Sequence, residues 1–384
     1  MNVLVVGAHF YNKGAHLMMI AVLEELKKQP DINLYLSPTT GTENQIRELG
    51  YGILDYPLKH VADEKSFNAF LNYGGILKHF KKKFRGELNV AELDAVLDIS
   101  GFAFSDQWGS RLVENVNSLI TFVKKKGAKY IFMPQAFGPF SSDHIKSEMN
   151  KTIEGADLIF ARDKVSYETL KDVSPSKNIL QSPDITISLH NNQISDEVDK
   201  YGCIVPNERM VDQGREFWPE GKYMEYLKSS IQKLSERGLK VYILLHDKGM
   251  GDVKLVNSLK EDYFMDNQLV SVRIEENPMK LKNFLGGAQL VIGSRFHALV
   301  SALSQDVPSM ALGWSHKYNM LFEEYGVEKL SFDRPDNKRF QESLNELLAP
   351  EGSMTIQETI INSNKVLQEK NKEMWSKVLK ELRS

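Results

Sequence analysis

One stretch, Leu290–Tyr318, decides the fold: LVIGSRFHALVSALSQDVPSMALGWSHKY. An apolar run at Leu290–Ile292 ends in a glycine, and Phe296–Ser304 carries apolar residues at helical spacing until Gln305–Pro308 ends the helix. Met310–Leu312 then forms a second short apolar run. The pattern predicts strand, tight turn, helix and strand, which is the repeating unit of a parallel α/β sheet.

The predicted helix begins with cations. If Ser294 is its N-cap, Arg295 and His297 lie in the first turn, where backbone N–H groups lack partners and the helix dipole is positive. Helix stability alone would favour Asp or Glu there, so the pair indicates that an anion binds between these side chains and the helix end. The alternative is structural: Arg295 pairs with a carboxylate elsewhere and His297 is half-buried.

Further cations follow other predicted strands. His316 and Lys317 come just after Met310–Leu312, His246 ends a predicted strand, and Arg209 lies in the loop after another. The carboxyl ends of parallel strands share one edge, and ligands of open α/β sheets bind at that edge. We therefore expect these side chains to border a binding cleft.

Composition excludes several classes of protein. The 384 residues, 42% of them hydrophobic, suffice for two cores, and 48 Lys plus Arg against 51 Asp plus Glu give a formal charge of −3. A nucleic-acid partner is not expected, because the basic excess is missing. With Cys203 as the single cysteine there is no internal disulfide and no cysteine metal cluster. No metal or cofactor site is predicted, and an N-terminus without a signal-peptide pattern favours a cytoplasmic protein.

The N-terminus reads as a strand, Asn2–Val6, a loop with glycines, and a helix. Asn12, Lys13 and Gly14 lie in the loop, which suits a phosphate or a sugar because glycine permits close backbone approach. The structural alternative is that Gly7 and Gly14 serve only packing, as in many first strand–helix turns.

The first half continues with strands alternating with helices. Ala95–Ile99, Tyr130–Met133 and Leu158–Ala161 read as strands, Leu112–Val123 reads as a helix, and Gln135 follows one strand end. This alternation predicts a doubly wound parallel sheet.

Two basic features of the first half have structural alternatives. Arg162 lies between a strand end and a helix start, where it faces a ligand unless it is held in an ion pair with Asp163 or another carboxylate. Leu77–Arg85 interleaves basic and aromatic residues, which suits either a solvated segment or peripheral contact with an anionic membrane.

The polar stretch Ser188–Lys200 predicts a linker between two domains. We expect an N-terminal Rossmann-like domain over 1–190, a C-terminal one over 200–345, and amphipathic helices over 351–384 that pack on the body of the protein.

The motifs resemble those of the polysaccharide pyruvyl transferase family. SRFHALVSALSQDVPSMALGWSHK is similar to its C-terminal signature, and PQAFGPF at 134–140, ARDKVS at 161–166 and PDI at 183–185 match other motifs in order. Asn12 and Gly14 lie where the family has an Asn-x-Gly element. The chain departs at Ala15, where the family usually has Asp, and at 100–102, where it usually has three glycines.

The resemblance implies a GT-B-like α/β fold, with two Rossmann-like domains facing a central cleft. It also implies an enzyme that transfers pyruvate from phosphoenolpyruvate to sugar hydroxyls as a ketal, in a cell-surface polysaccharide or a lipid-linked precursor. The second domain is then the donor side and the first the acceptor side. The predicted catalytic residues are His297, Arg295 and His246. Donor binding is predicted for Arg162, Arg295, His297, Lys317 and His316, and acceptor binding for Asn12, Lys13, Gly14, Gln135 and Arg209.

Two other functions fit parts of the pattern. A GT-B nucleotide-sugar glycosyltransferase would also need cations at a helix start, although the adjacent Glu323 and Glu324 are not spaced like the acidic pair of many such enzymes. A binding protein of the same fold that has lost catalysis would explain the altered glycine motifs, but Arg162, Arg295 and His297 argue for catalysis.

Overall fold

The computed structural model describes residues 1–37, 40–49, 52–54, 87–88, 92–189, 200–212, 214–246, 249–263 and 269–384. The chain forms two compact units: the first contains Met1–Ile185 and Lys370–Ser384, and the second contains Thr186–Glu369. The segment 351–384, for which the sequence predicts helices that pack on the body of the protein, lies partly in each unit. The basic segment Leu77–Arg85 and most of the predicted linker lie outside the described residues.

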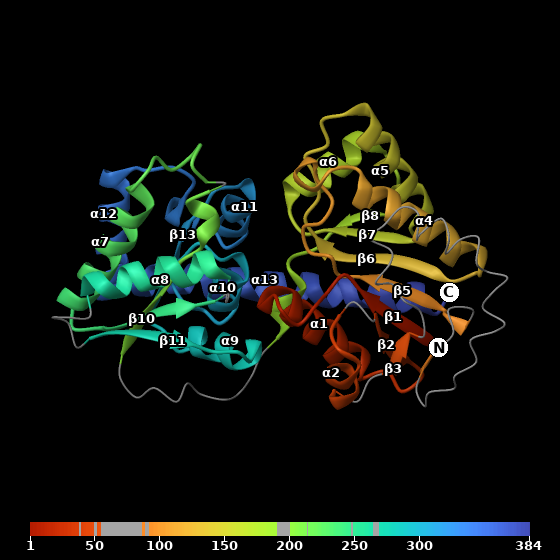
Figure 1. Ribbon diagram of the computed structural model, residues 1–384, viewed down its shortest axis with the longest axis horizontal. Coiled ribbons are helices and arrows are strands. Elements are labelled where there is room, and N and C mark those ends of the chain that lie inside the picture. The colour runs from red at the N-terminus through yellow and green to blue at the C-terminus, as the bar shows by residue number, and fades with distance from the viewer. Residues whose placement is uncertain are drawn as a thin grey trace. The chain divides into compact units, whose positions relative to one another are not determined.

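The first unit contains a parallel sheet with the strand order β4-β3-β2-β1-β5-β6-β7-β8 (Figure 1). Its strands are β1 (Asn2–Val6), β2 (Asn33–Leu36), β3 (Gly52–Leu54), β4 (Glu87–Leu88), β5 (Ala95–Asp98), β6 (Lys129–Gln135), β7 (Leu158–Ala161) and β8 (Ile179–Gln181). Its helices are α1 (Lys13–Leu26), α2 (Glu43–Glu48), the short 3-10 helix η4 (Asp106–Trp108), α4 (Arg111–Lys125), α5 (Asp143–Gly155) and α6 (Lys164–Val173). The 3-10 helix η5 (Ile185–Ser188) follows β8, and the first unit gives way to the second within it.

The core of the first unit follows from the alternation of side chains along each strand. Leu4 and Val6 of β1 belong to a buried cluster that also contains Val113 and Ile120 of α4 and Met149 of α5. Figure 1 shows α4, α5 and α6 gathered together. Because crossovers between parallel strands are right-handed, a sheet that grows in both directions from β1 places α1 on the face opposite to α4.

The second unit contains a parallel sheet with the strand order β11-β10-β9-β12-β13-β14. Its strands are β9 (Tyr201–Val205), β10 (Lys240–Leu245), β11 (Val270–Ile274), β12 (Leu290–Gly293), β13 (Ser309–Leu312) and β14 (Ser331–Phe332). Its helices are α7 (Lys222–Glu236), α8 (Met250–Tyr263), α9 (Pro278–Gly286), α10 (Phe296–Leu303), α11 (His316–Glu324) and α12 (Asn337–Leu348), with 3-10 helices η6 (Glu208–Met210) and η7 (Glu328–Leu330). One buried apolar cluster runs from Ile187 to Leu367.

Each sheet has one point at which the strand order reverses. In the first unit β1 pairs in parallel with both β2 and β5, and in the second β9 pairs in parallel with both β10 and β12. The strands added to either side of such a pair send their helices to opposite faces, and the loops after the pair diverge. The predicted α/β class with doubly wound parallel sheets is confirmed.

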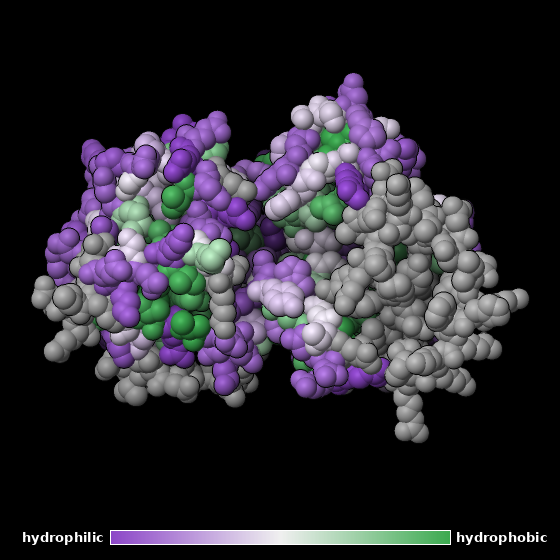
Figure 2. Space-filling view, viewed as in Figure 1, coloured by the Kyte–Doolittle hydropathy of each residue, from purple (hydrophilic) through white to green (hydrophobic). Residues whose placement is uncertain are grey.

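The C-terminal segment is a single helix, α13 (Pro350–Leu382). It buries Ile356 and Ile360 in the second unit and Trp375 and Val378 in the first. Among the described helices none is long and apolar enough to cross a membrane. Figure 2 shows hydrophilic residues over most of the visible described surface, with hydrophobic residues in small patches.

The turn after β1 depends on one glycine. Gly7 has φ of +88°, and a Cβ atom there would lie 2.3 Å from Ser100 Oγ and 2.6 Å from the Ser100 backbone nitrogen. Gly109, also in the first unit, has φ of +73° but no atom within 4 Å of such a Cβ. Substitution of Gly109 therefore introduces backbone strain alone, whereas substitution of Gly7 introduces backbone strain and steric overlap.

We expect Gly109→Ala to lower the free energy of unfolding by about 1–3 kcal/mol, because Gly109 has φ of 73° and ψ of 178°, a backbone conformation that is essentially open only to glycine. Gly7→Ala should cost roughly 1–3 kcal/mol more, because the added methyl group overlaps Ser100. Urea unfolding followed by circular dichroism measures both. Equal losses of unfolding free energy in the two variants would show that Ser100, just after β5, moves away from the added methyl group without a measurable cost.

Candidate functional site

The carboxyl edge of the second sheet brings four loops together. His246 follows β10, Asn207 follows β9, Arg295 follows β12 and His316 follows β13, in the order in which the strands pair. Neighbouring strands lie about 4.8 Å apart, so His246 and Arg295, with β9 between their strands, belong to strands about 10 Å apart. The expected convergence of Arg209, His246, Arg295 and His316 on one edge of this sheet is confirmed.

Ser294 does not cap the helix, and this prediction was wrong. The N-cap of α10 is Arg295, and Ser294 is completely buried. The Ser294 hydroxyl accepts a hydrogen bond from the Tyr223 hydroxyl at 2.9 Å, and its carbonyl accepts from Asn207 Nδ2 at 2.8 Å and from the Tyr318 hydroxyl at 2.7 Å. Tertiary partners have taken the side chain that local preference assigns to the cap.

The two tyrosines act as fixed donors. Burial raises the pKa of Tyr223 and the pKa of Tyr318 well above their usual range, so both hydroxyls keep their protons at physiological pH. The Tyr223 hydroxyl also accepts from the backbone N–H of Asn207 at 3.1 Å. The loop after β9 and the loop after β12 are therefore tied together by buried hydrogen bonds.

Arg295 is held by a buried carboxylate. Its Nη2 donates to Asp252 Oδ2, while Asp252 Oδ1 accepts from the backbone N–H of Glu208 at 2.8 Å. The Arg295 side chain is 17% exposed and that of Asp252 is 1% exposed. The structural alternative, in which Arg295 reaches a protein carboxylate, is thus confirmed, and its predicted role in donor binding stays a prediction.

The first turns of α10 and α11 carry basic side chains, His297 in the former and His316 and Lys317 in the latter, and no acidic residue. His297 is half-buried and packs edge-on against Phe296, with ring centroids 5.4 Å apart. Lys317 Nζ lies 5.1 Å from the centre of a Trp314 ring and 5.4 Å from that of Tyr318. Lys317 Nζ also lies 5.9 Å from the centre of the Phe296 ring, so the ammonium group is beside the start of α10.

Arg162 and Arg209 occupy very different surroundings. Arg162 is buried in the first unit, where Nη1 donates to Asp184 Oδ2 at 3.1 Å, while Asp163 caps α6 by accepting from the Ser166 N–H. The ion pair that was the alternative for Arg162 is present, and its donor role stays a prediction. Arg209 lies in the second unit and forms an exposed pair with Asp212 at 2.8 Å.

The remaining acceptor candidates lie in the first unit. Asn12 is the N-cap of α1, and its Oδ1 accepts from the N–H groups of Gly14 at 2.9 Å and Ala15 at 3.1 Å. Lys13 is 8% exposed. Gln135 is fully buried, and its Nε2 lies 3.4 Å from the carbonyl oxygen of Asp98.

Asp98 is a buried acid at the end of β5 that the sequence analysis missed. Its carboxylate accepts from the Tyr130 hydroxyl at 2.7 Å and from the Ser100 hydroxyl at 2.6 Å. Burial raises the pKa of Asp98, and the hydrogen bonds from Ser100, Tyr130 and Gln135 only partly oppose that rise. An acid of this kind takes up a proton more readily than an exposed one.

Asn207, Tyr223 and Asp252 were also missed in the second unit. An apolar strand ending in a polar residue was a usable signal for Asn207 and Asp98, because strand ends of one parallel sheet share an edge. Asp252 gave no such signal, since its partner Arg295 is 43 residues away.

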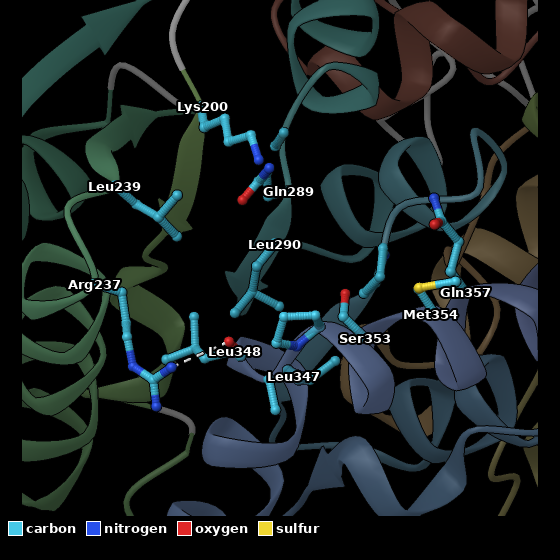
Figure 3. Close-up of a pocket in the computed structure, with 14 residues that line it drawn as sticks. Lys200, Arg237, Leu239, Gln289, Leu290, Leu347, Leu348, Ser353, Met354 and Gln357 are labelled. Carbon is cyan, nitrogen blue, oxygen red and sulfur yellow. Dashed lines mark hydrogen bonds between the residues drawn. The ribbon is translucent and has the colours of Figure 1, made fainter.

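A cavity of about 570 Å³ opens at the opposite edge of the second sheet (Figure 3). Residues at its wall include Lys200, Leu239 and Leu290, which lie before or at the amino ends of β9, β10 and β12. Arg237 Nη1 there donates to the Leu348 carbonyl at 3.4 Å. The lining includes none of the predicted site residues, so this cavity is separate from the candidate site.

The candidate site can be compared with known proteins. The family model for polysaccharide pyruvyl transferase matches residues 12–316, which include Asn12, Arg162, Arg295 and His297. The chain belongs to the polysaccharide pyruvyl transferase family. The predicted family is confirmed.

A curated relative and several solved structures are similar to this family member. The amylovoran biosynthesis protein AmsJ of Erwinia amylovora is 24% identical over 262 residues, which cover 63% of this chain and 62% of that protein. The UDP-GlcNAc 2-epimerase of Neisseria meningitidis has a TM-score of 0.59 at 13% identity, with 96% of this chain and 99% of that chain covered. A UDP-glucose: anthocyanidin 3-O-glucosyltransferase has a TM-score of 0.52 at 10% identity, with 100% and 98% covered. These structures establish the GT-B-like fold.

The ion pair of Asp252 predicts a large stability effect. We expect Asp252→Ala to lower the free energy of unfolding by roughly 3–5 kcal/mol, because it leaves the partly buried Arg295 and the Glu208 N–H without their acceptor. Asp212→Ala is the matched control, since it removes the exposed partner of Arg209 and should cost less than about 1 kcal/mol. Urea unfolding of the two variants measures the difference. Similar losses of unfolding free energy in the two variants would mean that the buried ion pair of Asp252 stabilises the fold no more than the exposed pair of Asp212.

Proposed function

We propose that this protein transfers the pyruvyl group of phosphoenolpyruvate to two hydroxyls of a sugar, in a cell-surface polysaccharide or its precursor, and so forms a ketal. The observation that carries the proposal is the start of α10, where Arg295 is the N-cap and His297 lies in the first turn, within the stretch that the family model matches. The naming of AmsJ as an amylovoran biosynthesis protein supports the polysaccharide.

The donor requires several cations in fixed positions. Phosphoenolpyruvate carries a phosphate ester and a carboxylate on the same carbon, and the planar fork of an arginine suits either group. The first N–H groups of α10 cannot be paired within the helix, and they add a partial positive charge beside Arg295. We assign the donor to this end of the second unit, with Arg295, His297, His316 and Lys317 as its side-chain ligands.

Asp252 is compatible with that assignment. A guanidinium has five N–H donors, and one carboxylate accepts at most two of them, so an orienting ion pair and a bound anion can share one arginine. Asp252 lies in the first turn of α8, where the helix dipole stabilises its charge. We assign to Asp252 the task of fixing the direction of the Arg295 guanidinium.

The reaction needs proton transfer as well as charge. The methylene carbon of the enol takes up one proton and becomes a methyl group, the two sugar oxygens bond to the central carbon as they lose their protons, and the phosphate leaves with the second proton. Cations at the phosphate stabilise its departure. His297 and His246 are the proposed acid and base, because imidazole exchanges protons near neutral pH.

Donor binding gives the first test of this function. Isothermal titration with phosphoenolpyruvate and, separately, with UDP should show binding of the first ligand only. Binding of UDP without phosphoenolpyruvate would replace the proposal with a nucleotide-sugar glycosyltransferase.

The variant Arg295→Lys keeps the charge and removes the planar fork. We expect it to weaken phosphoenolpyruvate binding at least tenfold, which is about 1.4 kcal/mol. Arg237→Lys at the opposite edge of the same sheet is the control and should leave the dissociation constant unchanged. An Arg295→Lys protein that binds phosphoenolpyruvate as tightly as the wild type would remove Arg295 from the donor site.

The variant His297→Gln separates proton transfer from binding. Glutamine keeps a hydrogen-bonding group of similar reach, so we expect donor affinity to change less than about threefold while the rate of phosphate release falls by roughly 10²–10⁴. Titration and a phosphate-release assay measure the two quantities. Equal losses in both would mean that His297 contributes to binding alone.

A further inference from the structure

Two exposed aromatic side chains stand out on the first unit. Tyr11 is 80% exposed and Trp108 is 49% exposed. Among the described residues the other exposed large hydrophobic side chains are aliphatic: Leu49, Leu112, Val211, Met250, Ile274, Met354 and Val366. Large aromatic rings are usually buried, so exposed ones on neighbouring loops favour a binding role.

The positions of the two rings follow from the topology. Tyr11 lies in the loop between β1 and α1, and Trp108 is the last residue of η4, in the loop between β5 and α4. β1 and β5 pair directly, and they are the strands at which the order of the first sheet reverses. Loops after such a pair diverge to opposite faces, and ligands of open α/β sheets bind between them.

The base of the two loops is polar and closely packed. Gly7 lies against Ser100, whose hydroxyl donates to the buried carboxylate of Asp98 at 2.6 Å. Gly7 itself is exposed and Ser100 is partly exposed. The loops that carry Tyr11 and Trp108 therefore begin at a common base, where Gly7 meets the partly exposed Ser100.

Hydrogen bonds hold both loops in place. The backbone N–H of Asn12 donates to His9 Nδ1 at 3.3 Å, and the His9 and Tyr11 rings lie 6.2 Å apart. In the other loop the backbone N–H of Trp108 donates to the Ser105 carbonyl at 3.1 Å. The rings are thus presented by ordered backbone, which lowers the entropy lost when a ligand binds.

We propose that Tyr11 and Trp108 form the subsite for the acceptor sugar, with at least one ring stacked on the C–H face of a pyranose. A pyranose has a flat apolar face and an edge of hydroxyls, which matches exposed aromatic side chains on two loops whose common base is polar. The proposal rests on the proposed function, since it names the part of the first unit that receives the acceptor. It adds two contact residues to those predicted from the sequence.

The experiment uses the full chain and simple sugars. Saturation-transfer NMR is recorded with the methyl pyranosides of galactose, glucose, mannose and N-acetylmannosamine at millimolar concentration. At least one glycoside should receive saturation at its ring protons, and its affinity should fall about tenfold in Tyr11→Ala and in Trp108→Ala. Trp108→Phe should retain part of the affinity, because a smaller ring still stacks.

Two controls separate the possible outcomes. Met354→Ala removes an exposed side chain from the second unit and should leave glycoside binding unchanged. Phosphoenolpyruvate affinity should be the same in the wild type and in both alanine variants. If glycosides bind through Tyr11 and Trp108 while phosphoenolpyruvate does not bind, the proposed function fails and the sugar subsite stands.

Other results would overturn the subsite. The proposal is contradicted if no glycoside receives saturation from the wild-type protein, or if the saturation transfer persists in both alanine variants. Sedimentation with phosphatidylglycerol vesicles tests a membrane contact by the same two rings. Loss of vesicle binding in both variants, without any glycoside contact in the wild type, would assign the rings to a lipid surface instead.

Discussion

The candidate donor site depends on the hydrogen bonds that fix the short segment between β12 and α10. Ser294 is surrounded by Tyr223, Asn207 and Tyr318, and the next residue, Arg295, is held by Asp252. These partners come from four other parts of the second unit, so the start of α10 cannot shift without breaking contacts to all of them. A cation in such a position is pre-organised, and little reorganisation is needed when a charged ligand arrives.

The two units have the same arrangement of strands at the point where the strand order reverses, but different residues follow those strands. In each sheet the first strand of the unit, β1 or β9, pairs with the strand at which the order reverses, β5 or β12, and the loops after the two paired strands approach each other. In the first unit a glycine at positive φ packs on Ser100 above Asp98, whereas in the second Asn207 and Tyr223 bond to Ser294. The first pair of loops exposes two aromatic rings, while the second is joined by buried hydrogen bonds and carries basic side chains. This contrast favours a neutral ligand on the first unit and an anion on the second.

Local pattern was sufficient to predict many of the strands, several of the helices and the edge that carries the site, but it did not predict short strands such as β8 and β14. Apolar runs such as Leu290–Ile292 correspond to β12, and the helix expected at Leu112–Val123 corresponds to α4. The ion pairs that orient the arginine side chains could not be predicted from local pattern. Arg162 and Asp184 are 22 residues apart, and Arg295 and Asp252 are 43 apart. The error at Ser294 has the same origin: capping preference is worth about 1 kcal/mol, and several buried hydrogen bonds outweigh it.

The ion pair with Asp252 changes how the cations at α10 are explained. From sequence, Arg295 and His297 at a positive helix end seemed to require an external anion, yet Asp252 supplies one negative charge at that place. Three further basic side chains, His297, His316 and Lys317, lie in the first turns of α10 and α11, which contain no acidic residue. The start of α8 is a third positive helix end, and the negative charge of Asp252 in its first turn interacts favourably with that helix dipole as well. The carboxylate therefore serves two structural partners, and the basic side chains at the starts of α10 and α11 are the groups that the proposed donor, with its two acidic groups, would contact.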